Sequence, residues 1–505
     1  MRPIRQDPRA TEGRGGPHRV LRCLPGRARI PIAALILTCL PVTTAGVPAQ
    51  AWAQSPAPPA AQLLADPPDA HALRLLGEAL AQVRANHVLP VDETALVQAA
   101  LKGMLNTLDG HSSYLTPTEF AALGETLNAE FAGIGLVIAV ENGDARAVSP
   151  VDGGPSARAG IPVGAIIREI DGQSAHGLGL PQVVARLRGA VGTPVQLTIV
   201  SGAQPPRRLT LIREVIRTTS VHWRAAGTLG YVRITNFDRR TAVDLVDALG
   251  KLRRAIPALS GVVLDLRNNP GGLFDAAVSV SSRFLPAGRI VVRKGRKIAD
   301  AQAIAVEPPG DVLGGLPLAV IVNGGSASSS EIVAGALQDN QRAVIVGMTT
   351  WGKGLVQTLI PLGDGRDGAL SVTAARYYTP SGRSIQKLGI VPDLAVARSE
   401  DEVRLALDAS RSPSEATLAR AIDNESGETR KPPLDPEIPA PQGGGASQAP
   451  PLFASSVPSN AELLDDLQIR RAIDVLTLGG VAQARKLRPM PILCTAVTPT
   501  AVSPK

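Results

Sequence analysis

The hydrophobic residues follow a helical period near the start of the expected folded part of the chain. Between Leu73 and Leu108 they recur at every third or fourth position, and the pattern is interrupted at Leu89-Pro90. A spacing of three and four places side chains on one face of an α-helix, and proline ends a helix. The pattern therefore predicts two amphipathic helices in a small helical segment, residues 70–130.

A two-residue period follows. Between Phe131 and Glu214, short alternating runs are separated by Gly and Pro, which is typical of a small β-rich module. One stretch inside it, Leu180–Leu187, has a helical pattern instead. We expect a β-rich module with one helix over residues 131–214.

Strand-like and helical patterns then alternate from Gly230 to Pro392. Apolar runs such as GVVLDL and LAVIVN each lead into a Gly-rich turn and then into a helical pattern. Such alternation is typical of an α/β domain, so we expect residues 215–405 to form one α/β body. A helical period returns between Ala461 and Leu478, which predicts a C-terminal helix over residues 461–480, before a tail of residues 481–505.

Two further segments have no apolar period. Residues 54–69 are rich in Pro and Ala, and residues 406–460 are rich in Pro, Ser, Gly and Ala. Such compositions bury too little apolar surface to fold on their own. We expect an extended linker in the first case and a disordered linker in the second.

The first 53 residues have the order of a secretory signal. Arg27 and Arg29 precede the 13-residue apolar run Ile30–Val42, and small residues then end in Ala49-Gln50-Ala51. Charge, apolar core and A-x-A site in this order predict export with cleavage, and hence a periplasmic protein. The alternative is a retained leader at the inner membrane, although this run is short for a helix that must span about 30 Å.

The formal net charge of +8 belongs mostly to that leader. Its first 30 residues hold eight Arg against Asp7 and Glu12, a net +6, so about +2 remains without them. Nucleic-acid binding through a phosphate-neutralising basic face thereby loses its support. The mature chain would keep one cysteine, Cys494, which excludes an intramolecular disulfide and a Cys-rich zinc site. We expect neither a metal nor a cofactor.

The segment LAVIVNGGSASSSEIVAGALQD places a serine cluster between an apolar strand and a helix. The first turn of a helix offers unpaired N–H groups and positive potential, which would stabilise an oxyanion beside a nucleophile. Serine is also a preferred helix N-cap. The cluster alone therefore does not establish catalysis.

A serine nucleophile needs a base to take its proton. None of the six histidines lies beyond residue 222, and the chain has no G-x-S-x-G elbow, which disfavours a Ser-His-Asp hydrolase. The α/β body instead offers Lys353 in TTWGKGLVQ. A lysine can act as a base when burial lowers its pKa to roughly 7–8.

Lys353 has a competing interpretation. Gly347–Lys353 satisfies G-x-x-x-x-G-K, the first seven positions of a nucleotide-binding P-loop. Gly354 stands where Ser or Thr would bind magnesium, and LVQTLIPL after it has the pattern of a strand rather than a helix. The sequence therefore disfavours nucleotide binding.

Two stretches, Asn323–Asp339 and Gly347–Gln357, resemble the active-site signature of the carboxy-terminal processing (tail-specific) proteases. That family uses a Ser-Lys dyad assisted by a Gln, with the lysine 25 positions after the serine. The resemblance implies Ser328 as the nucleophile, Lys353 as its base and Gln357 as the supporting residue.

A contact between the side chains of Lys353 and Gln357 would require a bent backbone. A straight strand would place them about 13 Å apart, at about 3.3 Å per residue. The contact therefore predicts a helical turn or bend, which Gly354 permits.

The stretch GVVLDLRNNPGGL resembles the strand and glycine turn of the same family. This implies an oxyanion hole formed by the amide of Gly271 or Gly272 together with that of Ser329. Ser329 replaces the family's usual Ala, which leaves Ser326, Ser329 or Ser330 as weaker alternatives for the nucleophile.

Residues 131–214 resemble a PDZ domain, which adds a peptide as an extra strand and holds its terminal carboxylate on backbone N–H groups. The matching loop is Gly133-Ile134-Gly135-Leu136, and Leu180–Leu187 would form the other wall of the groove.

The resemblance covers most of the chain and implies an α/β multidomain protein. Its catalytic core would be crotonase/ClpP-like, with the PDZ-like domain inserted after the helical segment. The implied activity is that of an ATP-independent serine endopeptidase that recognises the free, apolar C-terminus of exported proteins, in some cases with an adaptor protein. The alternative is a catalytically inactive PDZ-type peptide-binding scaffold.

Overall fold

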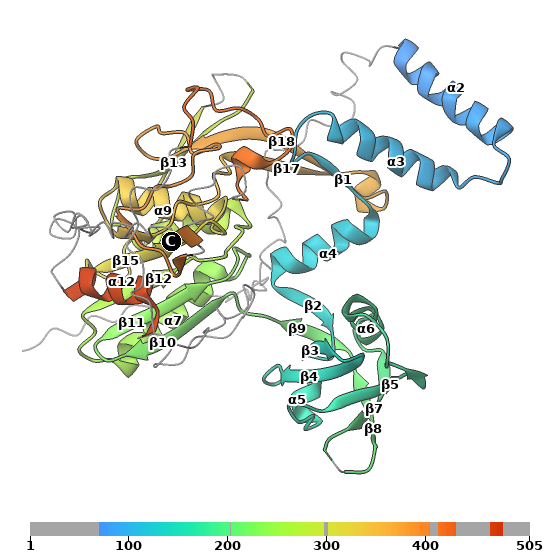
Figure 1. Ribbon diagram of the computed structural model, residues 1–505, viewed down its shortest axis with the longest axis horizontal. Coiled ribbons are helices and arrows are strands. Elements are labelled where there is room, and N and C mark those ends of the chain that lie inside the picture. Colours follow the sequence, from blue (N-terminus) through green and yellow to red (C-terminus); the bar gives the residue numbers. More distant parts are fainter. Residues whose placement is uncertain are drawn as a thin grey trace, which may run out of the picture. The chain divides into compact units, whose positions relative to one another are not determined.

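The computed structural model describes residues 70–202, 204–296, 301–400, 402–403, 413–430 and 465–477 (Figure 1). The expected secretory leader, the Pro/Ala linker and the C-terminal tail lie outside these residues. No helix within the described ranges has the length and apolar character needed to cross a membrane.

The catalytic body is built on a six-stranded sheet with the order β10-β11-β12-β15-β16-β19. Its strands are β10 (Val221–Ala226), β11 (Leu229–Ile234), β12 (Gly261–Asp265), β15 (Leu318–Val322), β16 (Val344–Gly347) and β19 (Leu394–Ala395). All neighbouring pairs are parallel except β10 with β11. Parallel strands covered on both faces are apolar along their whole length, which explains the unbroken runs GVVLD and LAVIV.

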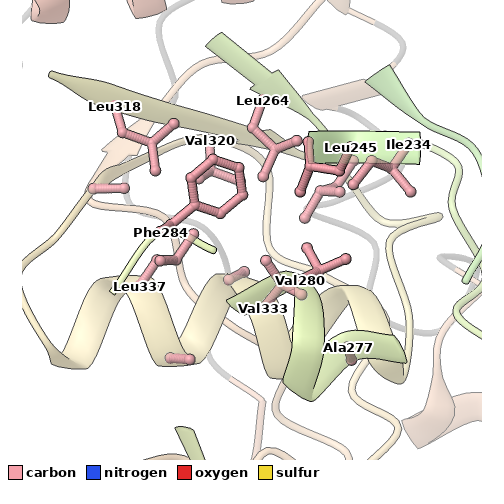
Figure 2. Close-up of a cluster of buried hydrophobic side chains, with 14 of the residues drawn as sticks. Ile234, Leu245, Leu264, Ala277, Val280, Phe284, Leu318, Val320, Val333 and Leu337 are labelled. Atoms are coloured by element: carbon pink, nitrogen blue, oxygen red, sulfur yellow. The ribbon is translucent and has the colours of Figure 1, made fainter. Parts of the chain in front are cut away.

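Helices cover both faces of this sheet. One face packs against α7 (Thr241–Ala255), α8 (Phe274–Ser282) and α9 (Ser329–Asp339), and the other packs against α12 (Leu467–Thr477). Successive side chains of a strand point to opposite faces. In β15, Val320 therefore joins the first core and Ile321 the second. Figure 2 shows Val320 of the sheet, Phe284 and Val333 of α9 in one cluster of apolar side chains.

A second, antiparallel sheet includes one strand, β1, from the N-terminal helical segment. Its order is β1-β18-β13-β14, and β17 also pairs with β18. The strands are β1 (Ser113–Leu115), β13 (Arg289–Lys294), β14 (Gln302–Ala305), β17 (Leu355–Pro361) and β18 (Ala369–Tyr378). Because β1 pairs with β18, residues near position 111 are brought to the catalytic body.

Three helices surround β1 in the sequence: α2 (Ala70–Asn86), α3 (Glu93–Asn106) and α4 (Pro117–Asn128). The break between α2 and α3 includes Leu89-Pro90, as predicted. Helix α4 begins with a capping box, in which Thr116 and Glu119 satisfy each other's backbone N–H groups. This third helix was not predicted.

The β-rich module has a core of its own. Its sheet order is β3-β4-β5-β7-β8, with β6 on β5. The elements are β3 (Leu136–Glu141), β4 (Asp144–Pro150), α5 (Pro155–Arg158), β5 (Ile166–Ile170), β6 (Gln173–Ser174), α6 (Leu180–Leu187), β7 (Pro194–Val200) and β8 (Arg207–Ile212). A two-stranded ribbon of β2 (Glu130–Gly133) and β9 (Glu214–Arg217) forms both ends of the module. The predicted helix is confirmed as α6.

The expectation of a disordered linker over residues 406–460 is wrong for residues 413–430. These residues contain the 3-10 helix η3 (Glu415–Thr417), and the side chains of Glu415 and Asn424 are buried. Composition misleads here because the segment is held by hydrogen bonds to the catalytic body rather than by an apolar face of its own.

Candidate active site

Three turns meet at the carboxyl ends of neighbouring parallel strands, which is where α/β sheets usually hold their sites. They follow β12, β15 and β16. Asn268 and Asn323 join the first two, because Asn323 Oδ1 accepts from Asn268 N (2.9 Å) and Asn323 Nδ2 donates to Asn268 Oδ1 (2.9 Å). Trp351 N donates to Ser326 O (3.0 Å) and joins the third turn to the second.

Ser328 lies between β15 and α9 in a strained conformation, with φ 55° and ψ −112°. A residue with a side chain seldom adopts a positive φ, and such strain is concentrated at functional sites. The conformation places Ser328 at the N-terminus of a buried helix. Its hydroxyl makes no capping hydrogen bond to that helix.

The other three serines of the cluster are buried, and their hydroxyls already have partners. Each donates to a main-chain carbonyl: Ser326 to Leu266 (2.8 Å), Ser329 to Gly272 (3.1 Å) and Leu273 (3.2 Å), and Ser330 to Asn269 (2.9 Å). These hydroxyls stabilise the turns, so the weaker alternatives for the nucleophile gain no support.

The glycine turn after β12 lies directly against Ser328. A Cβ on Gly271 would lie 2.8 Å from Ser328 Cβ and 3.0 Å from Ser329 N. The amide of Gly271 donates to Asn269 Oδ1 (2.9 Å). Within the described ranges, the amides of Gly272 and Ser329 donate no hydrogen bond. Two main-chain donors are therefore available beside Ser328.

The carboxylate of Glu331 links the backbones of Ser328 and Lys353. Its Oε2 accepts from Ser328 N (2.7 Å) and Lys353 N (2.9 Å), and its Oε1 accepts from Gly352 N (2.7 Å) and Thr350 Oγ1 (2.5 Å). Glu331 is fully buried. Burial raises its pKa to about 7, although the four donors lower it. Ser328 and Lys353, which lie after different strands, are thus held beside each other.

Tyr377 on β18 makes a second link between the same two residues. Its hydroxyl lies at hydrogen-bond distance from the carbonyl oxygen of Ser328 (3.0 Å) and from that of Lys353. Ser328 and Lys353 are 25 positions apart in the sequence. The carboxylate of Glu331 and the phenol of Tyr377 nevertheless hold their backbones together.

Burial lowers the pKa of the Lys353 ammonium, and the negative charges of Glu415, Glu331 and Asp109 raise it; the pKa remains below its ordinary value. Across the described part of the chain, no carboxylate forms an ion pair with Nζ. Lys353 is therefore closer to the neutral form at physiological pH than an exposed lysine.

Gln357 lies on β17, where its Nε2 donates to Thr373 Oγ1 (3.3 Å), which in turn donates to Asp109 Oδ1 (3.1 Å). Of the two conformations expected after Lys353, a helical turn or a bend, the structure has no helical turn but has an irregular strand. The chain continues without a helix into β17, and the irregularity is a β-bulge between residues 356 and 357. Among the described residues no hydrogen bond joins Gln357 to Lys353.

Sequence reasoning missed three side chains of this site: Glu331, His111 and Glu415. His111 was discounted because it precedes the catalytic body in the sequence, yet its Nε2 lies 2.9 Å and 3.0 Å from the two carboxylate oxygens of Glu415. Glu331 belongs to the serine-cluster motif, and LDGHSSYL contains His111. Only Glu415, in a Pro/Ser-rich stretch, gave no signal.

The predicted peptide-binding loop connects β2 to β3. Gly135 has φ 65°, and the carbonyl of Ile134 accepts from Ser156 N (3.0 Å) and Ser156 Oγ (2.7 Å). Among the residues that the structure describes, the amides of Ile134 and Gly135 donate no hydrogen bond. The loop can thus offer main-chain donors to an anion.

Residues 228–396 match peptidase family S41, and residues 146–201 match the PDZ domain family. The chain is also 42% identical, over 68% of its length and 79% of the relative's, to the carboxy-terminal-processing protease of Bartonella bacilliformis. This chain belongs to the carboxy-terminal-processing proteases. The family resemblance seen in the sequence is confirmed, together with an α/β fold that contains an S41 catalytic domain and a PDZ domain.

A second relative and a solved structure are also similar to this chain. The carboxyl-terminal-processing protease of a Synechocystis species is 36% identical over 64% of this chain and 75% of its own length. The solved structure of the photosystem II D1 C-terminal processing protease matches 68% of this chain and 92% of its own, with 30% identity and a TM-score of 0.38. The matches to peptidase family S41 and to the Bartonella relative show that this protein is a serine-type peptidase. PDZ domains bind peptide C-termini.

Replacing Glu331 with Gln tests the link between the two loops. The amide keeps the size of the side chain but replaces one of the two accepting oxygens with an NH2 group, so the donors that face this group lose their acceptor. We expect the free energy of unfolding to fall by about 1–3 kcal/mol and peptidase activity to fall at least tenfold, roughly.

Thermal unfolding and cleavage of a peptide substrate measure these two effects. The matched control is Glu78→Gln on the exposed face of α2, which we expect to leave both unchanged. A Glu331→Gln protein as stable and active as the wild type would contradict the assignment.

Proposed function

We propose that this protease cleaves exported proteins after capturing their free, apolar C-terminus, with Ser328 as the nucleophile and Lys353 as its general base. The observation that carries the proposal is the shared bonding of Ser328 and Lys353 to Glu331 and Tyr377. It holds together a strained serine at a helix N-terminus and a lysine whose pKa burial has lowered.

The chemistry follows from these positions. Neutral Lys353 accepts the proton of the Ser328 hydroxyl as Oγ attacks the scissile carbonyl carbon. The amides of Gly272 and Ser329 donate to the resulting oxyanion. The Lys353 ammonium then gives its proton to the leaving amine as the C–N bond breaks, which leaves an ester on Ser328 and a neutral lysine.

Hydrolysis of the ester repeats these roles. Lys353 takes a proton from water as its oxygen attacks the ester carbonyl, and returns it to Ser328 Oγ as the C–O bond breaks. Of the two glycines in the turn, we assign the oxyanion role to Gly272, since the amide of Gly271 is already bonded to Asn269. Gln357 supports this site from β17 through Thr373.

The PDZ domain supplies the substrate-binding part of the proposal. An extended tail adds to β3 beside α6, and its terminal carboxylate accepts from the amides of the loop Gly133-Ile134-Gly135-Leu136. Under the same proposal, the leader (residues 1–53) directs export of the protease to the periplasm.

Variants of the serine cluster distinguish the nucleophile from its neighbours. We expect Ser328→Ala and Lys353→Ala each to lower kcat/KM by about 1,000-fold or more. Ser329→Ala is the matched control. It removes a hydroxyl bonded to the turn carbonyls and should stay within about threefold of the wild type, with a stability loss of about 1 kcal/mol. Equal cleavage by the wild type and Ser328→Ala would refute the mechanism.

Paired reporter proteins that differ only in their last residues test tail recognition. We expect an apolar C-terminus to be cleaved at least about tenfold faster than an acidic one, because the groove binds apolar side chains. Gly135→Ala should raise KM for the apolar tail by about tenfold, which corresponds to about 1.4 kcal/mol of binding.

Gly160→Ala is the control for the PDZ loop. Gly160 has φ 64°, almost the same as Gly135, but a Cβ there would meet no atom within 4 Å. Equal KM values in the two variants would contradict recognition by the loop. Binding of the tail without any cleavage by the wild type would instead indicate an inactive scaffold.

A further inference from the structure

Residues 413–430, called the strap below, lie against the loop that carries Lys353. Arg430 donates to the carbonyl oxygens of Trp351 (3.1 Å) and Thr349 (3.3 Å), and Asn424 Nδ2 donates to Gln386 O (3.0 Å). The strap also reaches the N-terminal segment, because Gly110 N donates to Arg420 O (3.2 Å). It is thus bonded both to the lysine loop and to the turn that contains His111.

One side chain of the strap points into this junction. Glu415 is fully buried, and three side chains from other parts of the chain donate to it or share a proton with it. Trp351 Nε1 donates to Oε2 (3.1 Å), Gln386 Nε2 donates to Oε1 (2.9 Å), and His111 Nε2 lies within 3.0 Å of both oxygens. Burial raises the pKa of Glu415, but its hydrogen bonds hold the pKa below its ordinary value, so the carboxylate is charged at neutral pH.

These bonds hold the lysine loop on both sides of Lys353. On one side, Glu415 bonds to Trp351 twice, through the indole N–H and through its own backbone N–H, which donates to Trp351 O (3.1 Å). On the other side, it acts through Gln386, whose Oε1 accepts from Gly354 N (2.8 Å). Lys353 lies between these two anchored residues.

We propose that Glu415 is a positioning residue for Lys353: it fixes the backbone of residues 351–354 from the strap side and supplies a negative charge near the ammonium. This rests on the proposed role of Lys353 as the base. Glu331 holds the same loop from the side of α9, so the lysine loop lies between two buried carboxylates that come from distant parts of the sequence.

Several titratable groups surround Lys353, and all of them except Glu415 are unchanged in the variants below. Glu331 faces it from α9, Asp109 faces it from the turn after α3, and Glu415 faces it from the strap. His111 contacts Glu415, and Tyr377 on β18 contacts the Lys353 carbonyl. Among the three carboxylates, Glu415 raises the pKa of Lys353 most.

The sign of the pH effect follows from this charge. The base must be neutral, so kcat/KM rises with pH as Lys353 loses its proton. A nearby carboxylate favours the ammonium and moves that rise to higher pH. Removing the charge of Glu415 therefore moves the acid limb of the kcat/KM profile to lower pH.

The test is the kcat/KM profile against pH for cleavage of a peptide with an apolar C-terminus by the full-length protein. For Glu415→Gln we expect the acid limb to move down by about one pH unit and the high-pH plateau to fall by about tenfold. Trp351→Phe keeps an aromatic side chain but removes the indole N–H that donates to Glu415. We expect it to lower the plateau and leave the acid limb in place, because the charge remains.

Glu425→Gln is the matched control, since Glu425 lies on the same strap but bonds to Tyr378 rather than to the lysine loop. It should reproduce the wild-type profile. An unchanged limb and plateau in Glu415→Gln, at a wild-type melting temperature, would overturn the proposal. A lowered plateau with an unmoved limb would overturn the proposed charge effect of Glu415 on Lys353 and leave only its role in fixing residues 351–354. If Glu415→Gln does not fold, a wild-type plateau in Trp351→Phe overturns the positioning role.

Ser328→Ala and Lys353→Ala, measured in the same assay, distinguish a failure of the proposed mechanism from a failure of the role of Glu415 alone. If either cleaves as the wild type does, the proposed mechanism fails, whatever Glu415 does. If both are inactive while Glu415→Gln retains the wild-type profile, only the role of Glu415 fails.

Discussion

The carboxylate of Glu331 lies where the loops after β15 and β16 meet, and the candidate site depends on its four hydrogen bonds. A buried charge is tolerated only when its oxygens are satisfied. The backbone donors come from Ser328, Gly352 and Lys353. Movement of either loop would leave the carboxylate without partners, so the energetic penalty of burying Glu331 also fixes the separation of Ser328 and Lys353.

The sheet supplies the rigidity that this arrangement needs. Because β12, β15 and β16 are parallel neighbours, the turns at their carboxyl ends are brought together without long loops. Helix α9 is buried along almost its entire length, so its N-terminus cannot shift to relieve the strained conformation of Ser328. A strained serine, two unused amides and a desolvated lysine can persist only on such a support.

Local patterns predicted the parts of the site that local sequence determines. The strand-turn-helix around Ser328 and the strand that begins after Gly354 follow from apolar periods and glycine positions, and both were found. The proposed choice of Gly272 over Gly271 as oxyanion donor could not be made from sequence, because it rests on the hydrogen bond from the Gly271 amide to Asn269. Glu415 could not be found either: its segment has the composition of a linker, and its order comes from side chains far away in the sequence.

A crystal structure of the protease with a peptide boronic acid, whose sequence ends in the preferred apolar residues, would test the proposed mechanism most directly. We expect a boron–oxygen bond to Ser328 Oγ and a boronate oxygen about 2.7–3.1 Å from the amides of Gly272 and Ser329. We also expect Lys353 Nζ within hydrogen-bond distance of Ser328 Oγ. A bond to another hydroxyl of the cluster, or Nζ turned away with His111 in its place, would contradict it.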